Sequence, residues 1–162
     1  INLIGKVFME KHRCPFETFE DLVAPYDTSE HVIFVDFHAE ATSEKRTFGR
    51  YIDGRCHAVV GTHTHIQTAD AVVLPGGSAY IPDVGMTGPH DSIIGVETKI
   101  VTDLFVTKTR TPFKQARTGG ALNGVLVTID TETMKTTRIQ RIQKTLADDG
   151  FDFVEAEDVQ PW

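Results

Sequence analysis

Two short apolar runs separated by one amphipathic segment constrain the fold of this chain more than any other feature. Residues 32–37 (VIFVDF) and 58–61 (AVVG) are typical of strands buried on both faces of a parallel sheet. The segment from Thr42 or Ser43 to Ile52 predicts a helix, because either hydroxyl can serve as its N-cap. The order strand, helix, strand predicts a βαβ unit and therefore an α/β fold.

The sequence after this unit predicts hairpins rather than further parallel strands. We expect one hairpin around the Pro-Gly-Gly turn at residues 75–77, because short apolar runs flank it on both sides. The other expected elements are a loop at 83–91, a helix at 98–107 and a second hairpin from 122–129 and 135–142.

The sequence also predicts how the two ends of the chain are structured. Residues 1–7 resemble a strand that is already under way, so we expect the chain to begin inside a fold, with its N-terminal strands missing. Residues 148–162 form an acidic tail that we expect to fray. Residues 1–147 would then be a portion of one domain.

Composition limits the cellular location and the kinds of binding partner that we expect for this chain. The net charge of −7 argues against a broad nucleic-acid surface, although a metal ion could still attract a small phosphate ester. No apolar run approaches the roughly 18 residues that a membrane span needs, so we expect no membrane segment. The two cysteines, Cys14 and Cys56, do not resemble a disulfide framework, which favours a reducing, cytoplasmic location.

Three histidines follow the two predicted strands at the points where the strands end. His63 and His65 are one residue apart, so in extended backbone their rings point to the same side. His38 follows the neighbouring strand, and the carboxyl ends of parallel strands meet at one edge of a sheet. Taken alone, His63 and His65 could equally be two exposed loop histidines. Together with His38 they predict a transition-metal site, since neutral imidazoles favour Zn, Fe, Mn, Co or Ni.

A site with two metal ions also needs carboxylates to offset the positive charge. Asp36, Glu40 and Asp83 are the nearest candidates along the sequence. Each also has a plainer possible role: Asp36 lies within a strand, and Glu40 lies where a carboxylate favours a helix N-terminus. Asp36 or Asp83 could alternatively bond to the second ring nitrogen of a ligating histidine.

Four sequence blocks together resemble a known family. They are residues 36–45 (DFHAEATSEK), 61–65 (GTHTH), 67–70 (QTAD) and 83–89 (DVGMTGP). As a set they are similar to the bacterial YmdB-like phosphodiesterases, a branch of the calcineurin-like metallophosphoesterases, over residues 1–142.

The resemblance carries implications for fold, activity and ligands. It implies a sandwich of β-sheets flanked by helices that hydrolyses phosphodiesters, such as 2′,3′-cyclic nucleotides, through a metal-bound hydroxide. It implies His38, His63 and His65 as ligands of divalent transition metal ions, expected to be two and to be Fe, Mn or Zn. The family's remaining Asp, Glu and Asn ligands and its general-acid histidine have no counterpart here, because Asn2 and Asn123 lie in other contexts.

That departure leaves a second hypothesis open, in which the chain is an inactive truncated domain or a scaffold that retains part of the metal site. It also predicts association with a second copy or with a complementary N-terminal segment, because sheet edges would be exposed. An amidohydrolase barrel is a weaker alternative, because such barrels need about 250 residues.

Other polar residues are expected to have plainer roles. His90, in the Gly/Pro loop, is more readily a surface residue than a substrate contact, and Thr87 or Gly88 could offer a donor to a phosphate oxygen. The residues expected to be structural or solvent-exposed are His12, His31, His57, Arg46, Arg50 and Arg55.

Overall fold

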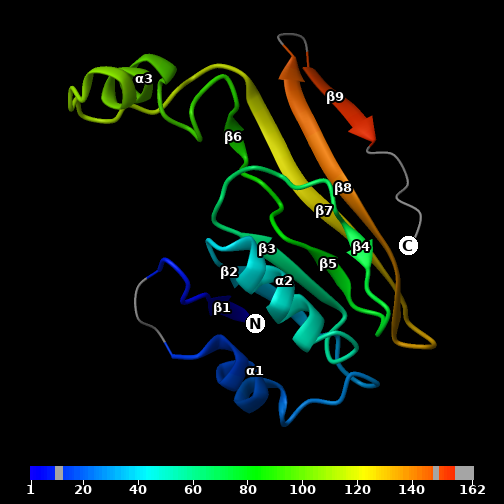
Figure 1. Ribbon diagram of the computed structural model, residues 1–162. Coiled ribbons are helices and arrows are strands. Elements are labelled where there is room, and N and C mark those ends of the chain that lie inside the picture. The colour runs from blue at the N-terminus through cyan, green and yellow to red at the C-terminus, as the bar shows by residue number, and fades with distance from the viewer. Residues whose placement is uncertain (10–12, 148–149, 156–162) are drawn as a thin grey trace.

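The protein folds into three layers, seen in a computed structural model that describes residues 1–9, 13–147 and 150–155 (Figure 1). Helices α1 (Pro15–Val23) and α2 (Thr42–Tyr51) cover one face of a five-stranded sheet. A four-stranded antiparallel sheet packs on the opposite face. The predicted α/β class, with sheets flanked by helices, is confirmed.

The five-stranded sheet has the order β1-β2-β3-β5-β4. Its strands are β1 (Asn2–Ile4), β2 (Phe34–His38), β3 (Ala58–Thr62), β4 (Val72–Val73) and β5 (Ala79–Ile81). β1, β2, β3 and β5 are parallel, and β4 is antiparallel to β5. The predicted βαβ unit is therefore β2-α2-β3, and the first predicted hairpin is β4-β5.

The second sheet has the order β6-β7-β8-β9. It comprises β6 (Gly88–Pro89), β7 (Gly120–Asp130), β8 (Lys135–Ala147) and β9 (Gly150–Glu155). The second predicted hairpin is confirmed as β7-β8, although its strands are longer than expected. Within the predicted tail, β9 pairs with β8 instead of fraying, and residues 148–149 and 156–162 lie outside the described residues.

Helix ends differ in detail from the predictions. The N-cap of α2 is Ala41, without a side-chain cap, because Thr42 already belongs to the helix. Helix α3 (Thr98–Thr107) coincides with its predicted range and projects away from the two sheets (Figure 1). None of the helices in the described part of the chain is long and apolar enough to cross a membrane. Both cysteines are free thiols.

The alternation of side chains along β3 builds two separate cores. Val59 faces the helices and joins the cluster that contains Phe37 and Phe48, whereas Val60 faces the second sheet and joins Ile139. The expectation that β2 is buried on both faces is wrong for Phe34, which is 41% exposed. The reason is that the second sheet packs against β4 and β5 and leaves part of the β2 face open.

The strand predicted at residues 1–7 ends at Ile4. Beyond it, the backbone N–H groups of Lys6 and Val7 bind a side chain of α2 instead of a neighbouring strand. The backbone amides of Lys6 and Val7 donate to the Glu44 carboxylate of α2, at 2.8 and 3.2 Å. A side chain at Gly5 would collide with Ala39 and with the same carboxylate, so glycine is needed for this close approach.

A buried ion pair joins α2 to the segment that follows β5. Lys45 Nζ lies 2.8 Å from Asp83 Oδ2, and both side chains are 2% exposed. The same carboxylate accepts hydrogen bonds from the amide and hydroxyl of Thr64, at 2.9 and 2.7 Å, and from the Gly85 amide at 2.9 Å. Burial by itself would raise the pKa of Asp83, but these hydrogen bonds outweigh it and hold that pKa below its usual range.

Replacing Asp83 tests how much this pair stabilises the fold. Asp83→Asn leaves the Lys45 charge buried without a counter-charge, so we expect a loss of about 3–5 kcal/mol in the free energy of unfolding. The control Asp70→Asn, which removes the exposed pair with Arg46, should cost about 0–1 kcal/mol. Urea unfolding at neutral pH measures both, and equal losses would contradict the prediction.

The lowered pKa of Asp83 also predicts how the stability difference between wild type and Asp83→Asn depends on pH. A carboxyl whose pKa is lower in the folded state stabilises the protein above its unfolded pKa, and this contribution disappears as the pH falls through the folded pKa. The difference in unfolding free energy between wild type and Asp83→Asn should therefore shrink in acid.

Aromatic packing provides a test of the helix-side core. Phe48 is fully buried, its ring stacked on Phe37 at 4.2 Å between centroids. Phe48→Ala should destabilise the fold by about 3–5 kcal/mol, because it removes a large buried ring and leaves a cavity. Phe105 is 72% exposed on α3, so Phe105→Ala should change the unfolding free energy by less than about 0.5 kcal/mol. A comparable loss in both variants, measured by urea unfolding, would contradict this assignment of the core.

Candidate functional site

Two of the predicted histidines lie side by side at the carboxyl edge of the five-stranded sheet. His38 is the last residue of β2 and is paired in register with Thr62, the last residue of β3. His63 follows directly, and its ring meets that of His38 edge to face at 4.8 Å between centroids. The parallel register of β2 and β3 thus brings together side chains that are 25 residues apart in the sequence.

A hydrogen-bond relay fixes the orientation of the His38 ring. The Thr62 hydroxyl donates to Asp36 Oδ1 at 2.8 Å, because an ionised carboxylate can only accept. The Thr62 oxygen must then accept from His38 Nδ1, which lies 3.0 Å away. Asn2 holds the other Asp36 oxygen at 2.7 Å. His38 therefore carries its proton on Nδ1 and presents the lone pair of Nε2.

His63 is oriented by a carboxylate in a similar way. Its Nε2 lies 2.9 Å from Glu40 Oε2, so this nitrogen is the donor, and in the neutral ring Nδ1 carries the lone pair. His63 Nδ1 in turn lies 3.1 Å from His38 Nε2. Either a proton on one of these two nitrogens or a metal ion bound by both makes this contact favourable.

The spacing of these two nitrogens suits a shared metal ion. Imidazole nitrogens bind transition metals at about 2.0–2.1 Å, so two of them on one ion lie about 2.9–3.4 Å apart at right-angled to tetrahedral geometry. The observed separation of 3.1 Å falls within this range. The supporting carboxylates, Asp36 through Thr62 and Glu40 directly, have the positions of groups that orient ligands rather than bind the ion.

The backbone that carries these histidines is strained. His63 and His65 have φ angles of 107° and 68°, which non-glycine residues rarely adopt. Thr64, between them, is held by its amide and hydroxyl on Asp83, and the Met86 amide donates to the His65 carbonyl at 3.0 Å. The surrounding hydrogen bonds therefore maintain a conformation that costs on the order of 1–3 kcal/mol per strained residue.

His65 does not join the other two rings. It is exposed, and its Nδ1 lies 3.4 Å from the carbonyl oxygen of Ile94. In the part of the chain that the structure describes, no three His, Cys, Asp or Glu side chains are grouped closely enough to hold one ion. The structure thus brings together His38 and His63, with Glu40 beside them, and leaves His65 apart.

The candidate carboxylates have three different positions. Glu40 contacts the outer nitrogen of His63, and Asp36 reaches His38 through Thr62. Asp83 is paired with Lys45 and bonds to Thr64, so it contacts the backbone between the histidines rather than a ring. Sequence reasoning missed Thr62 and Lys45, although the parallel register of β2 and β3 would have pointed to Thr62.

Gly61 serves close packing rather than an unusual backbone angle. A Cβ at this position would collide with the carbonyl oxygen of Pro82, which follows β5. The Val84 amide donates to the Gly61 carbonyl at 2.9 Å, so the chain after β5 lies directly against the end of β3. This contact places Asp83 beneath Thr64.

The loop after β5 turns toward the second sheet. His90 Nε2 lies 3.2 Å from the Met86 carbonyl, and Asn123 of β7 contacts both groups. Thr87 donates to the Asn123 carbonyl at 3.4 Å. His90 and Thr87 therefore have structural partners away from the paired histidines.

Two other histidines are structural or exposed, as the sequence predicts. His57 is buried and accepts a hydrogen bond from the Ile33 amide at 3.1 Å, and His31 is exposed. His12 lies outside the described residues.

Comparison with known proteins connects this geometry to a family. The sequence profile of the family described as YmdB-like protein matches residues 1–142. A 2′,3′-cyclic-nucleotide 2′-phosphodiesterase from Bacillus subtilis (strain 168) is 48% identical over 142 residues, covering 88% of this chain and 54% of the relative.

Two crystal structures have the same fold. A hypothetical protein from Thermus thermophilus superposes with a TM-score of 0.80 at 33% identity, covering 97% of this chain and 57% of that one. A novel phosphatase from Mycoplasma pneumoniae superposes with a TM-score of 0.81 at 37% identity, covering 89% and 52%.

This chain spans about half the length of the relatives that it matches. The match nevertheless includes both sheets and the paired histidines, since residues 1–142 extend from β1 into β8. The chain belongs to the YmdB-like protein family.

Proposed function

We propose that this chain supplies part of the metal centre of a phosphodiesterase that acts on small phosphodiesters such as 2′,3′-cyclic nucleotides. The observation that supports it most is the pair of imidazole nitrogens, His38 Nε2 and His63 Nδ1, that lie 3.1 Å apart. The substrate class comes from the Bacillus subtilis relative, whose name describes a 2′,3′-cyclic-nucleotide 2′-phosphodiesterase. We assign His65 to the same centre as a third ligand, which requires its ring to leave the Ile94 carbonyl.

The residues of this chain would hold and orient divalent ions such as Fe, Mn or Zn, two in the complete centre. When bound, such ions supply positive charge that activates a water and offsets the charge of the phosphate. His38 would bind through Nε2 and His63 through Nδ1, because Thr62 and Glu40 already engage the other nitrogen of each ring. The Lys45–Asp83 pair holds Thr64, and thereby keeps the strained histidine backbone in place.

One observation favours a second candidate function, that of a scaffold which binds a single ion without turnover. Within the described residues only two imidazoles converge, and a centre with two ions needs further carboxylate ligands. Titrating the 162-residue chain with Mn²⁺ while assaying a cyclic nucleotide separates the two. Turnover that requires the metal supports the enzyme, whereas binding of one ion without hydrolysis supports the scaffold.

Removing the paired imidazoles tests the metal site itself. His38→Ala and His63→Ala should each weaken the binding of Mn²⁺ or Zn²⁺ by at least about 100-fold, since even outer partners of a ligand contribute about 10–100-fold. The loss is measured by calorimetric titration of the isolated chain. His31→Ala, which removes an exposed histidine on a distant loop, is the matched control and should bind metal normally. Normal metal binding by His38→Ala and His63→Ala would refute the site.

The relay to Asp36 makes a separate prediction. Thr62→Val preserves the side-chain shape but removes the hydroxyl that links His38 to Asp36, so metal affinity should fall by about 10–100-fold. Thr62→Ser should restore most of the affinity, because its hydroxyl can make both hydrogen bonds. Equal affinities for the Val and Ser variants would show that the relay does not orient His38.

A further inference from the structure

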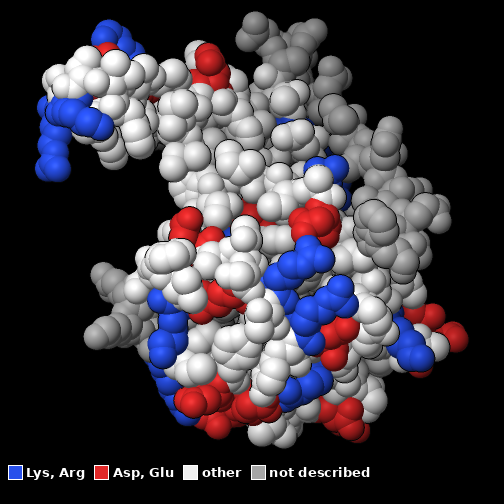
Figure 2. All heavy atoms as spheres, viewed as in Figure 1, with Lys and Arg blue, Asp and Glu red and all other residues white. Residues whose placement is uncertain are grey.

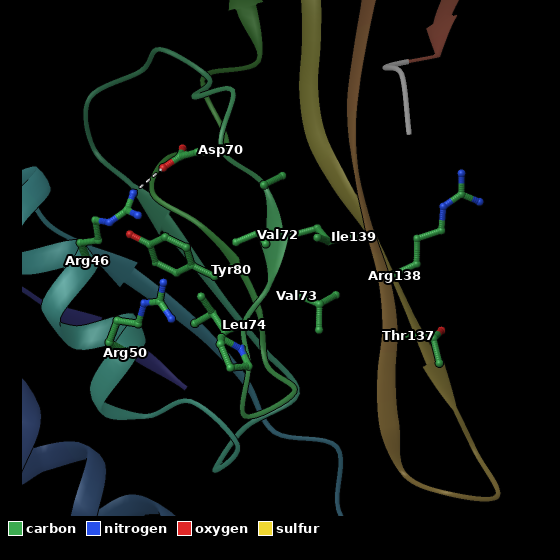
Figure 3. A pocket seen from close by; sticks show the side chains of 12 residues that line it. Arg46, Arg50, Asp70, Val72, Val73, Leu74, Tyr80, Thr137, Arg138 and Ile139 are labelled. Atoms are coloured by element: carbon green, nitrogen blue, oxygen red, sulfur yellow. Dashed lines mark hydrogen bonds and ion pairs between the residues drawn. The ribbon is translucent and has the colours of Figure 1, made fainter. Parts of the chain in front are cut away.

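A cavity lies at the β4 edge of the five-stranded sheet, and none of its lining residues is a histidine. Its volume is about 630 Å³, which is within the range of small-molecule sites. Arg46 and Arg50 of α2 line one side, and Val72 and Leu74 line another. Figure 3 shows both arginines and the Tyr80 ring between α2 and the β4 segment.

The two arginines concentrate positive charge on an acidic protein. They are four residues apart on α2 and therefore lie on the same face of the helix. Figure 2 shows basic side chains gathered over α2, on the side that faces β4. Among the described residues, Asp70 is the one acidic residue that lines the cavity, and it lies 3.3 Å from Arg46 in an exposed pair that contributes little to stability.

Tyr80 adds a polar group with no partner within the described residues. Its side chain enters the cavity region from β5 and is 4% exposed, yet its hydroxyl makes no hydrogen bond. The hydroxyl points toward the helix that carries Arg46 and Arg50 (Figure 3). Burial raises the pKa of Tyr80, so the phenol remains a protonated donor at neutral pH. A buried donor without an acceptor is costly, and a ligand oxygen would relieve that cost.

Arg138 also lines the cavity but does not contribute to this cluster. Its side chain extends from β8 away from the arginines of α2 (Figure 3). The cationic part of the cavity is thus confined to the α2 side, next to the apolar wall formed by Val72 and Leu74.

We propose that this cavity binds a phosphate monoester that carries an aromatic ring, such as a nucleoside monophosphate. Two guanidinium groups match a phosphate dianion better than a single carboxylate, because each can donate paired N–H groups to phosphate oxygens. The Tyr80 hydroxyl is covered in this structure, so it donates to a third oxygen once the exposed side chains of Arg46 and Arg50 have shifted to bind the phosphate. The ring then lies against Val72 and Leu74. The anion takes the place of Asp70 beside Arg46.

Calorimetric titration with adenosine 5′-monophosphate tests this site on the 162-residue chain. EDTA is present throughout, so that no metal at the histidines can attract the phosphate. We expect saturable binding, weaker binding of inorganic phosphate and weaker binding of adenosine. No saturation with the nucleotide, or equal binding of adenosine, would overturn the proposal. Equal binding of inorganic phosphate would overturn the role of the ring.

Variants locate the binding to the cavity. Replacing both Arg46 and Arg50 by Gln should lower the affinity at least about tenfold, since each loses a charged hydrogen-bonding partner. Replacing both Lys108 and Arg110 by Gln, which removes two exposed cations at and after the end of α3, is the charge-matched control and should bind normally. Unchanged affinity in the double variant would place the nucleotide elsewhere and overturn the proposal.

Substitutions of Tyr80 and Asp70 should change the nucleotide affinity in opposite directions. Tyr80→Phe should weaken nucleotide binding several-fold without lowering the unfolding midpoint, because the hydroxyl has no partner among the described residues. Asp70→Asn should tighten binding by up to about fivefold, because it removes the anion that competes for Arg46. Unchanged binding in Tyr80→Phe, or weaker binding in Asp70→Asn, would contradict the proposed geometry.

Discussion

The buried pair of Lys45 and Asp83 is the interaction on which the arrangement of the sheet edge depends. Three segments meet at this pair: α2, the turn after β3 and the chain after β5. Taking two charges out of water is costly, and the cost is offset here because Asp83 accepts four hydrogen bonds, two of them from Thr64. An ion pair with so many specific partners is satisfied in one arrangement of these segments only.

The strained histidine backbone follows from that arrangement. Asp83 binds both the amide and the hydroxyl of Thr64, and His63 and His65 have positive φ angles on either side of it. In this backbone conformation the His63 ring lies against His38, with the two facing nitrogens 3.1 Å apart. Stability supplied by a buried pair thus helps to maintain the strained backbone that carries these histidines.

One sheet offers two different chemical environments. At its carboxyl edge, parallel strands bring two imidazoles together with orienting carboxylates, which suits a metal ion. At its β4 edge, α2 presents two arginines beside a buried phenol, which suits an anion. Helix α2 contributes to both, since Lys45 points into the core whereas Arg46 and Arg50 point along the outer face.

The sequence by itself determined the βαβ unit, both hairpins, the range of α3 and the positions of the histidines at the strand ends. These features depend on local periodicity and turn residues, which a sequence displays directly. Only the tertiary structure decided which histidines meet, because the rings of His38 and His63 depend on Thr62 and Glu40, and His65 is turned away by its strained backbone. The tertiary structure also decided the role of Lys45. In the sequence, a buried lysine on an amphipathic helix looks the same as an exposed one, and its partner Asp83 lies 38 residues away.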